Sequence, residues 1–429
     1  MKDSIPCLYA EYGRYINRFR SIPYYIDALK PVERRLLISL YHTAKSDFTK
    51  SAKVIGHCIA NYHPHGDQSA YESLVGLVHR GFAVGQGNWG SKYGLNEIPP
   101  AAMRYTRVKL SDSIRSLFEE LLYYVRYEEF EMESEPVFLP SPIPLGLIGD
   151  NVTTGISFYS TKIPQYDFKD LIERLKYILG IRDEIIIRPN FKDCMIKDVN
   201  NGIKKILSKG EGTIKIIPKY EIESKNLIII GKPRIYGFSR LIKTCDNMKL
   251  SVIDNSKTKH GTRIIIEGGA SSENNVKKII DSVTYEIKFS CYFVDDTGNA
   301  KIFGIDDILK GCIDNYKDAT INYLKDQFHI LKEKKEDIKI IKIIRDCVTT
   351  ERKIGDLDTL ISKIRAKYPN VDESRVRKVC NKYNISSLVK YRIDEESIIK
   401  EMEEVESKLN NIDKTVTDII VERLPLLNL

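Results

Sequence analysis

The 429-residue chain lacks the features of a secreted or membrane-spanning protein. Its eight cysteines include no C-x-x-C pair and have no short regular spacing, which argues against a disulfide framework and against a zinc site. The first residues, MKDSIPCLYAEYGRY, contain no apolar signal region, and no run of about 18 apolar residues occurs anywhere. We therefore predict a cytoplasmic protein with reduced, buried cysteines and no membrane partner.

Positive charge is concentrated near the N-terminus. The chain has 67 Lys and Arg against 59 Asp and Glu, a formal net charge of +8. Residues 1–110 contain 15 of the basic and 8 of the acidic residues, together with five of the seven histidines. Because Lys and Arg that neutralise phosphates release condensed counterions, this region favours a polyanionic partner such as a nucleic acid. A basic surface that only contacts solvent is the alternative.

Residues 34–82 have helical periodicity. Apolar residues recur at spacings of three and four in three short segments that turn residues separate. Three short helices with a basic surface resemble a helix-turn-helix DNA-binding unit. Small helical domains without a nucleic-acid partner are commoner, so the pattern alone leaves both interpretations open.

The middle of the chain predicts an α+β region, and the length suggests about three domains in all. Residues 111–135 are predicted to form an acidic helical stretch, and residues 136–164 have the prolines, glycines and β-branched residues of loops and strands. Helices alternate with strands between residues 168 and 300. Two of these predicted strands flank Ser224-Lys225-Asn226, and GTRIIIEGG at 261–269 is another.

The last third of the chain predicts two coiled-coil helices. Apolar residues follow a 4,3 alternation in each: Ile321, Leu324, Phe328 and Leu331 in the first, and Ile398, Met402, Val405, Leu409, Ile412, Val416 and Ile419 in the second. Two short helical pieces lie in the roughly 50 residues between them. We expect an antiparallel arm that carries a globular tip, and a plain helical bundle is the alternative.

Candidate chemistry centres on AAMRYT, where Tyr105 directly follows Arg104. A tyrosine in water has a pKa of about 10, so it is a poor nucleophile unless a neighbouring cation stabilises the phenolate. Arginine does this, and it also neutralises charge on a phosphate. Upstream, His63 and His65 flank a proline. Their spacing suits a metal site, a general base or neither; without a cysteine beside them, we favour hydrogen bonding to phosphate and predict no metal site.

Several motifs occur in order: RSIPYYIDALKPVERR, KSAKVIGHCIANYHPHGDQSAYESLV, VGQGNWGS, AAMRYT and PIPLGLIGDNVTTGISFYSTKIP. In this order and spacing they resemble the breakage-reunion subunit of type IIA DNA topoisomerases, such as the A subunits of gyrase and topoisomerase IV. Length and Ile, Lys and Asn usage lean toward the medium subunit of tailed-phage topoisomerases. The resemblance implies cytoplasmic action in a bacterium or a phage-infected host.

The resemblance also implies a domain order. Residues 1–135 would form a winged-helix domain that carries the catalytic tyrosine, and residues 136–304 a tower domain with a DNA-bending segment. Residues 305–345 and 394–429 would form the coiled-coil arm, and residues 346–393 a helical tip that closes a homodimer.

Site residues follow from the resemblance position by position. Tyr105 would attack a DNA phosphodiester and form a transient 5′-phosphotyrosyl link, while Arg104, Arg20 and His65 would stabilise the phosphate. The resemblance places six residues at the DNA: Lys30, Arg34, Arg35, His63, Gln68 and Ile156. Ile156 matches the wedge that inserts between base pairs and bends the duplex.

The chain departs from the family pattern at several positions. Tyr24, Ile26 and Ala28 replace an Asp, an Arg and a Gly of the motif R-x-L-P-D-x-R-D-G-L-K-P. Gln68 replaces the small hydroxyl residue that, with an acidic residue matching Glu72, helps quinolone drugs bind, so we expect weak quinolone sensitivity.

The sequence has no P-loop and no D-x-D constellation, since VDDTG holds adjacent aspartates. ATP and Mg²⁺ are therefore expected to be held by an ATPase/Toprim large subunit, which acts with this chain on double-stranded DNA. The chain ends at Leu429 without a β-rich domain, so we expect relaxation or decatenation in preference to supercoiling.

Two other classes of function remain as alternatives. In a non-catalytic DNA-binding or architectural protein, Tyr105 would only stack, and Tyr105→Phe would cost nothing. A tyrosine recombinase or nicking enzyme would act alone, so it would need its full arginine cluster or its metal in this chain, and it gives the coiled-coil arm no role.

Overall fold

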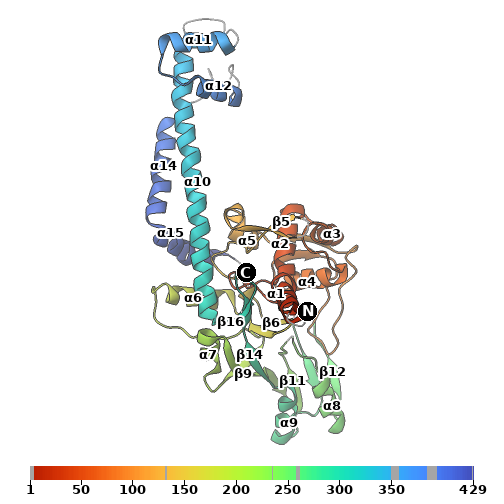
Figure 1. Ribbon diagram of the computed structural model, residues 1–429. Helices are drawn as coiled ribbons and strands as arrows, with labels where there is room; N and C mark the ends of the chain where they lie inside the picture. Colours follow the sequence, from red (N-terminus) through yellow and green to blue (C-terminus); the bar gives the residue numbers. More distant parts are fainter. Residues whose placement is uncertain are drawn as a thin grey trace. The chain divides into compact units, whose positions relative to one another are not determined.

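The computed structural model describes residues 4–130, 133–233, 235–257, 261–348, 357–383, 394–427 and 429. The chain divides into two compact units (Figure 1). Unit 1 comprises residues 1–316 and 416–429, and unit 2 comprises residues 317–415. Helices and several small antiparallel sheets occur together, which confirms the predicted α+β class at this level. No helix among the described residues is long and apolar enough to cross a membrane.

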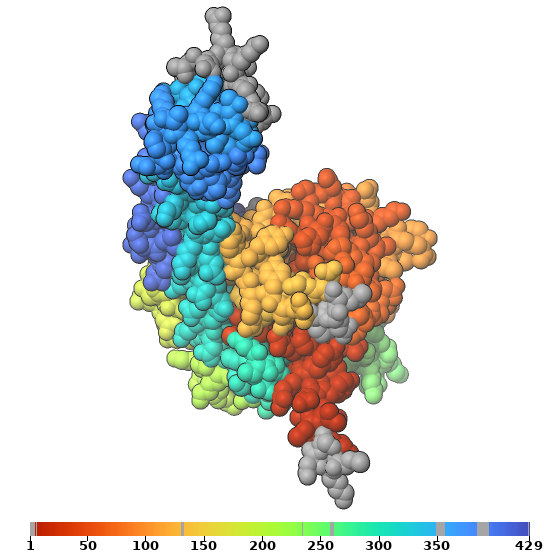
Figure 2. Space-filling view, turned by 45° about the horizontal axis from the view of Figure 1, so that its top comes forward, coloured from red at the N-terminus to blue at the C-terminus, as the bar shows by residue number. Residues whose placement is uncertain are grey.

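The N-terminal part of unit 1 contains the three helices predicted within residues 34–82. Its elements are α1 (Ser4–Ile16), the π-helix η1 (Asn17–Ser21), α2 (Pro31–Thr43), β1 (Thr49–Lys50), α3 (Ser51–Asn61), α4 (Asp67–His79), β2 (Ala83–Gln86) and β3 (Arg107–Leu110). The helices α2, α3 and α4 pack on one another, and the strands form an antiparallel sheet in the order β1-β3-β2. The N-terminal helix lies at the surface, red in Figure 2.

The predicted helix over residues 111–135 is wrong for most of its length. Of the described residues in this stretch, only α5 (Asp112–Phe118) and the 3-10 turn η2 (Leu122–Tyr124) are helical, and a hairpin of β4 (Tyr127–Phe130) and β5 (Glu133–Pro136) follows. Long-range contacts explain the hairpin, because Glu128 and Glu135 each form an ion pair with an arginine of the N-terminal segments. The residues after β5 then join a buried cluster with Tyr24 and Ile26.

The largest sheet of unit 1 is antiparallel and has the strand order β6-β7-β14-β9-β8. Its strands are β6 (Val152–Ile156), β7 (Ser160–Pro164), β8 (Cys194–Val199), β9 (Glu211–Pro218) and β14 (Tyr285–Ser290). The short turn η3 (Leu145–Leu147) precedes β6 in the chain, and α6 (Phe168–Ile178) and α7 (Gly202–Lys209) lie between later strands. The β6–β7 hairpin projects residues 157–159 at its tip.

A second antiparallel sheet has the order β10-β11-β13-β12. It is built from β10 (Tyr220–Glu223), β11 (Asn226–Ile229), β12 (Val252–Asp254) and β13 (Ile264–Ile266), and it packs against α8 (Ser239–Asn247) and α9 (Glu273–Val283). The strand predicted before Ser224 is broken at Lys219 into β9 and β10, which belong to different sheets. The turn at Ser224 (φ 57°) and the strand within 261–269 are confirmed. A small hairpin, β15 (Tyr292–Val294) with β16 (Ala300–Ile302), follows.

Both long helices predicted for the last third are present. They are α10 (Ile305–Val348), which begins in unit 1, and α14 (Glu395–Asn410), which α15 (Ile412–Asp418), η4 (Ile419–Arg423) and η5 (Leu424–Leu426) follow. Within unit 2, Lys317 pairs with Asp413 and Lys342 pairs with Glu395, so α10 and the α14–α15 segment run antiparallel. The heptad residues from Ile398 to Ile419 are half-buried or buried.

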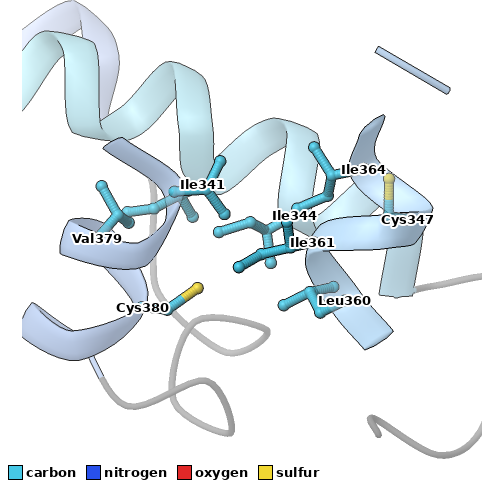
Figure 3. Close-up of a cluster of buried hydrophobic side chains, with 9 residues drawn as sticks. Ile341, Ile344, Cys347, Leu360, Ile361, Ile364, Val379 and Cys380 are labelled. Atoms are coloured by element: carbon cyan, nitrogen blue, oxygen red, sulfur yellow. The ribbon is translucent and has the colours of Figure 1, made fainter. Parts of the chain in front are cut away.

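The far end of α10 packs against the two short helices predicted between the long ones, α11 (Leu357–Lys367) and α12 (Glu373–Lys382). Nine buried side chains form this core, and Figure 3 labels eight of them: Ile341, Ile344, Cys347, Leu360, Ile361, Ile364, Val379 and Cys380. Part of the tip predicted for residues 346–393 lies outside the described residues.

Candidate active site

Tyr105 lies on a tight turn at the surface of unit 1. Its backbone N–H donates to the carbonyl oxygen of Ala102 (2.8 Å), and its side chain is 69% exposed. The guanidinium carbon of Arg104 lies 4.7 Å from the centroid of the Tyr105 ring. An exposed phenol with an adjacent cation is accessible to a large polyanion, and the guanidinium can compensate negative charge on a phosphate placed there.

Buried hydroxyl groups, which sequence analysis missed, hold the turn that carries Tyr105. Thr106 is fully buried, and its hydroxyl donates to Ser51 Oγ (2.8 Å) at the start of α3. The hydroxyl of Tyr71, on α4, donates to the carbonyl oxygen of Ala101 (2.7 Å) and lies 2.9 Å from Thr106 Oγ1. Two helices therefore hold the residues on both sides of Tyr105, and the threonine of the RYT sequence was the available signal.

The glycine-rich run before the turn approaches the backbone of Tyr105 closely. Gly87 has φ 99°, and a Cβ there would lie 3.3 Å from the carbonyl oxygen of Tyr105. Positive φ and this close approach both favour glycine. Residues 87–93 and His79 line a cavity of about 360 Å³ beside this run. The glycine at position 87 therefore lets this run pack closely against the backbone of Tyr105.

His63 and His65 lie together with two arginines. Arg35 Nη1 is 3.2 Å from His63 Nδ1, and the rings of the two histidines are perpendicular with centroids 4.6 Å apart. His63 is buried, whereas His65 is half-buried and Arg20 is exposed on η1. Burial, followed by the charges of Arg35, His65 and Arg20, lowers the pKa of His63 to about 3. His63 is therefore a neutral ring at physiological pH.

Arg34 and Arg35 are buried and paired with carboxylates. Arg34 forks onto Asp27, with Nε–Oδ2 and Nη2–Oδ1 distances of 2.7 and 3.0 Å. Arg35 forks onto Glu135, with both N–O distances 2.7 Å, and only 1% of Arg35 is exposed. This burial counts against the predicted direct contact of Arg34, Arg35 and His63 with a DNA backbone, because each would first have to leave its partner.

The other predicted DNA residues are accessible. Lys30 is half-buried at the N-terminal end of α2, and its backbone N–H donates to Glu33 Oε2 (2.9 Å). Gln68 is exposed on α4, with Nε2 3.2 Å from Glu72 Oε1. Ile156 is 78% exposed at the end of β6, next to the hairpin tip. A large apolar side chain this exposed has no packing role in the chain itself.

Tyr24, one of the positions that depart from the family motif, has a partner of its own that it shares with Tyr25. Tyr24 and Tyr25 donate through their hydroxyls to the two carboxylate oxygens of Asp296 (2.5 and 3.0 Å), and Arg126 donates to the same group (2.8 Å). The neighbouring Asp295 accepts from the backbone N–H groups at 297 and 299. Both aspartates of VDDTG are thus satisfied by protein donors. Among the described residues, no group of three or more His, Cys, Asp or Glu could hold a metal ion.

Helix α4 joins the two parts of the candidate site. It begins two residues after His65, and its Tyr71 holds the turn that carries Tyr105. Arg20, Arg35, His63 and His65 therefore form one group, and Arg104 with Tyr105 forms the other, linked by a shared helix.

Comparison with known proteins identifies the family. Residues 20–424 match the family model of the DNA gyrase/topoisomerase IV A subunit. The chain is 28% identical to the A subunit of DNA topoisomerase 4 from Bacillus subtilis (strain 168), over 100% of this chain and 57% of the relative. It is 32% identical to the same protein of Staphylococcus aureus (strain NCTC 8325 / PS 47), over 76% of this chain and 44% of the relative. It thus spans about half the length of these relatives. The chain belongs to the family of DNA gyrase and topoisomerase IV A subunits.

Proposed function

We propose that the chain is the DNA-cleaving and rejoining subunit of an ATP-dependent type IIA topoisomerase, which relaxes or decatenates DNA. The observation that carries the proposal is the exposed Tyr105 on a turn fixed by α3 and α4, with the Arg104 guanidinium at its ring. Membership of the family over residues 20–424 supports the same activity.

The reaction exchanges one phosphate ester for another. The phenolic oxygen of Tyr105 attacks a DNA phosphorus and loses its proton, the bond from phosphorus to the 3′ oxygen breaks, and that oxygen takes up a proton. A 5′-phosphotyrosyl link and a free 3′ hydroxyl result, and the reverse reaction reseals the strand. Since one ester replaces another, cleavage itself needs no ATP. Arg104, with Arg20 and His65, stabilises the negative charge on the phosphate in the transition state.

We assign residues 1–135 to a winged-helix domain. The chain order α2-β1-α3-α4-β2-β3 with sheet order β1-β3-β2 supports this assignment. Helix α4 then takes the place of the recognition helix, which enters the major groove in helix-turn-helix proteins. Gln68, exposed in its first turn, is a base or backbone contact, and Lys30 contacts the backbone nearby.

The remaining domains follow the family order. Residues 136–304 form the tower, and Ile156 on its exposed hairpin is the wedge. Insertion of the wedge unstacks two base pairs at a cost of a few kcal/mol, which the contacts of the bent DNA with the protein offset. Residues 305–345 and 394–429 form a coiled-coil arm, supported by the antiparallel ion pairs between α10 and the α14–α15 segment. Residues 346–393 form the tip that closes a homodimer. Two strands are cut by two Tyr105 residues, so two chains are needed.

Mg²⁺ and ATP are assigned to an ATPase/Toprim large subunit. The described residues do not fit a metal site, because the adjacent aspartates of VDDTG already accept from protein donors. The Bacillus and Staphylococcus relatives are likewise named as the A subunit of a topoisomerase, which implies a further subunit. Strand passage therefore needs the complex.

A denaturant-resistant adduct assay tests this function. The chain is mixed with 5′-labelled and, separately, 3′-labelled duplex DNA, Mg²⁺ and a Toprim-bearing subunit, and the reaction is quenched with detergent. We expect label linked to protein only through the 5′ end, and its loss in Tyr105→Phe. Tyr123→Phe is the matched control, because Tyr123 is 64% exposed in the same unit. DNA retention without any adduct, unchanged by Tyr105→Phe, would instead support a DNA-binding protein.

A further inference from the structure

We infer that Glu135 is a positioning residue of the cleavage site: through Arg35 it fixes both the ring of His63 against His65 and the segment that presents Arg20. The inference rests on the proposed function, in which Arg20 and His65 act on the phosphate. Glu135 belongs to none of the sequence motifs that carry the family resemblance, and it lies in the β4–β5 hairpin.

The contacts of Arg35 define this arrangement. Nε and Nη2 donate to the two carboxylate oxygens of Glu135, each at 2.7 Å, and Glu135 is only 5% exposed. The remaining nitrogen, Nη1, lies 3.3 Å from the carbonyl oxygen of Phe19 and 3.2 Å from His63 Nδ1. Because the guanidinium is planar, two hydrogen bonds from Nε and Nη2 to one carboxylate fix the orientation of the whole group, including Nη1. Glu135 therefore sets where Nη1 donates.

Each of these two donations reaches a predicted phosphate partner. Phe19 directly precedes Arg20 on η1, so its carbonyl contact ties down the segment that carries the exposed guanidinium. His63 is joined to His65 by the perpendicular ring contact and by the backbone bond from His65 N–H to His63 O (2.7 Å). One buried ion pair thus orders two groups from different parts of the chain.

The arrangement also fixes the charge of the site. A guanidinium can only donate, so His63 Nδ1 accepts and the proton of the neutral ring is on Nε2. The charged groups that face His63 are Arg35 from α2, Arg20 from η1 and His65 from its own turn, and all three oppose its protonation. The group on α3 is the buried thiol of Cys58. Burial raises the pKa of this thiol to about 12. Glu135 faces Arg35 from β5. The exposed positive charge beside His63 is therefore that of Arg20.

Four variants of the full chain test the inference. Glu135→Gln removes the anion and leaves Arg35 uncompensated, whereas the double variant Glu135→Gln with Arg35→Gln removes both charges and leaves no unpaired buried ion. Arg35→Lys keeps the charge and loses the fork. Asp306→Asn is the matched control, because Arg174 forks onto Asp306 at 2.8 and 2.7 Å in the same unit, away from the histidines.

Two measurements are made on each variant. The first is adduct formation with the Toprim-bearing subunit from pH 5.5 to 8.5, with DNA retention and the thermal unfolding midpoint as its controls for binding and folding. The second is the titration of His63 by ¹³C-histidine NMR of the full chain, with the signal assigned through His63→Gln. The second measurement needs no cleavage. It therefore tests the contact from Glu135 through Arg35 to His63 even if the wild-type chain forms no adduct and the proposed function fails.

We expect adduct formation to fall about 10- to 100-fold in Glu135→Gln and in the double variant, with DNA retention nearly unchanged, because misplaced groups cost this much. In the double variant the loss of the Arg35 charge raises the pKa of His63 above its wild-type value, although burial, the larger cause, still holds it below 6.5. Arg35→Lys keeps a cation beside His63 and leaves its titration as in the wild type, and Asp306→Asn leaves both the adduct profile and the titration unchanged. Overturning results are an equal loss at every pH with an unchanged His63 titration, or a wild-type His63 that titrates above pH 5.

Discussion

The hydroxyl of Tyr71 on α4 donates to the carbonyl oxygen of Ala101 and lies 2.9 Å from Thr106 Oγ1, so this phenol holds the chain before Tyr105 and packs against the residue after it. Tyr71 is only 3% exposed, and its ring packs near Trp89 of the glycine-rich run. The exposed Tyr105, the proposed nucleophile, therefore stands on a buried, hydrogen-bonded support. Positioning by such a support is worth much in catalysis, because reacting atoms must approach within a narrow range of geometry.

Tyr71→Phe is expected to lower adduct formation about tenfold, because removal of this support lets the turn move. The cost in the free energy of unfolding is about 1 kcal/mol, the net worth of a buried hydrogen bond. Chemical denaturation and the adduct assay measure the two effects separately. Tyr62→Phe, a half-buried tyrosine at the end of α3, serves as control. Equal adduct yields in Tyr71→Phe and wild type would contradict the role of the support.

Ala28 occupies the position of the family glycine and has φ +55°, in the left-handed region. This conformation costs an alanine about 1–2 kcal/mol, whereas glycine adopts it freely but loses some entropy on folding. We therefore expect Ala28→Gly to stabilise the chain by about 0.5–1 kcal/mol, measured by urea denaturation. Ala102→Gly, at an exposed position with a negative φ, should not stabilise it. An unchanged or lower stability of Ala28→Gly would show that the strain is relieved in another way.

The lowered pKa of His63 makes stability depend on pH. The unfolded chain binds a proton at His63 near pH 6.5, and the folded chain only near pH 3. Between these values the unfolded state binds more protons, so stability falls as the pH falls. From pH 7.5 to pH 5.5 the loss is about 1.4 kcal/mol for this group. His63→Gln should remove that part of the slope while the other histidines still contribute, and denaturation midpoints at both pH values measure it. Parallel slopes in the two proteins would contradict the assignment.

Ile156→Ala tests the wedge without disturbing the fold. Since the side chain is 78% exposed, the free energy of unfolding should change by less than about 0.5 kcal/mol. The bend of bound DNA, measured by energy transfer between end labels, should decrease. Ile222→Ala, at a 54% exposed isoleucine on β10, is the matched control and should leave the bend unchanged. An unaltered bend in Ile156→Ala would remove the wedge from the proposal.

Local periodicity predicted the helices α2, α3, α4, α10 and α14, because amphipathic spacing is written in the sequence itself. The hairpin that replaces the predicted helix over 111–135 depends on Glu135 meeting Arg35, 100 residues away, and no local pattern carries that contact. The same holds for the site. Arg104 and Tyr105 are neighbours in the chain and were predicted, whereas the burial of Arg35 and His63 arises only when distant segments pack. Sequence reasoning therefore singled out Arg104 and Tyr105, whose catalytic role stays a prediction, and missed the hydroxyl groups that hold their turn.

In unit 2, a buried carboxylate on α10 holds helix α12. Asp337 on α10 is 4% exposed and accepts from Arg375 (2.7 Å) and Lys382 (2.8 Å), both on α12. Asp337→Asn removes the buried carboxylate that these two cations share, so α12 should be destabilised by about 2 kcal/mol. Hydrogen exchange in α12 should then rise about 30-fold, while exchange in α2 stays unchanged, because the two helices belong to different units. Glu336→Gln is the control, because the Glu336 carboxylate accepts from Lys339 on the next turn of the same helix. If exchange rises equally in α2 and α12, Asp337 supports the whole chain, and the two units do not unfold independently.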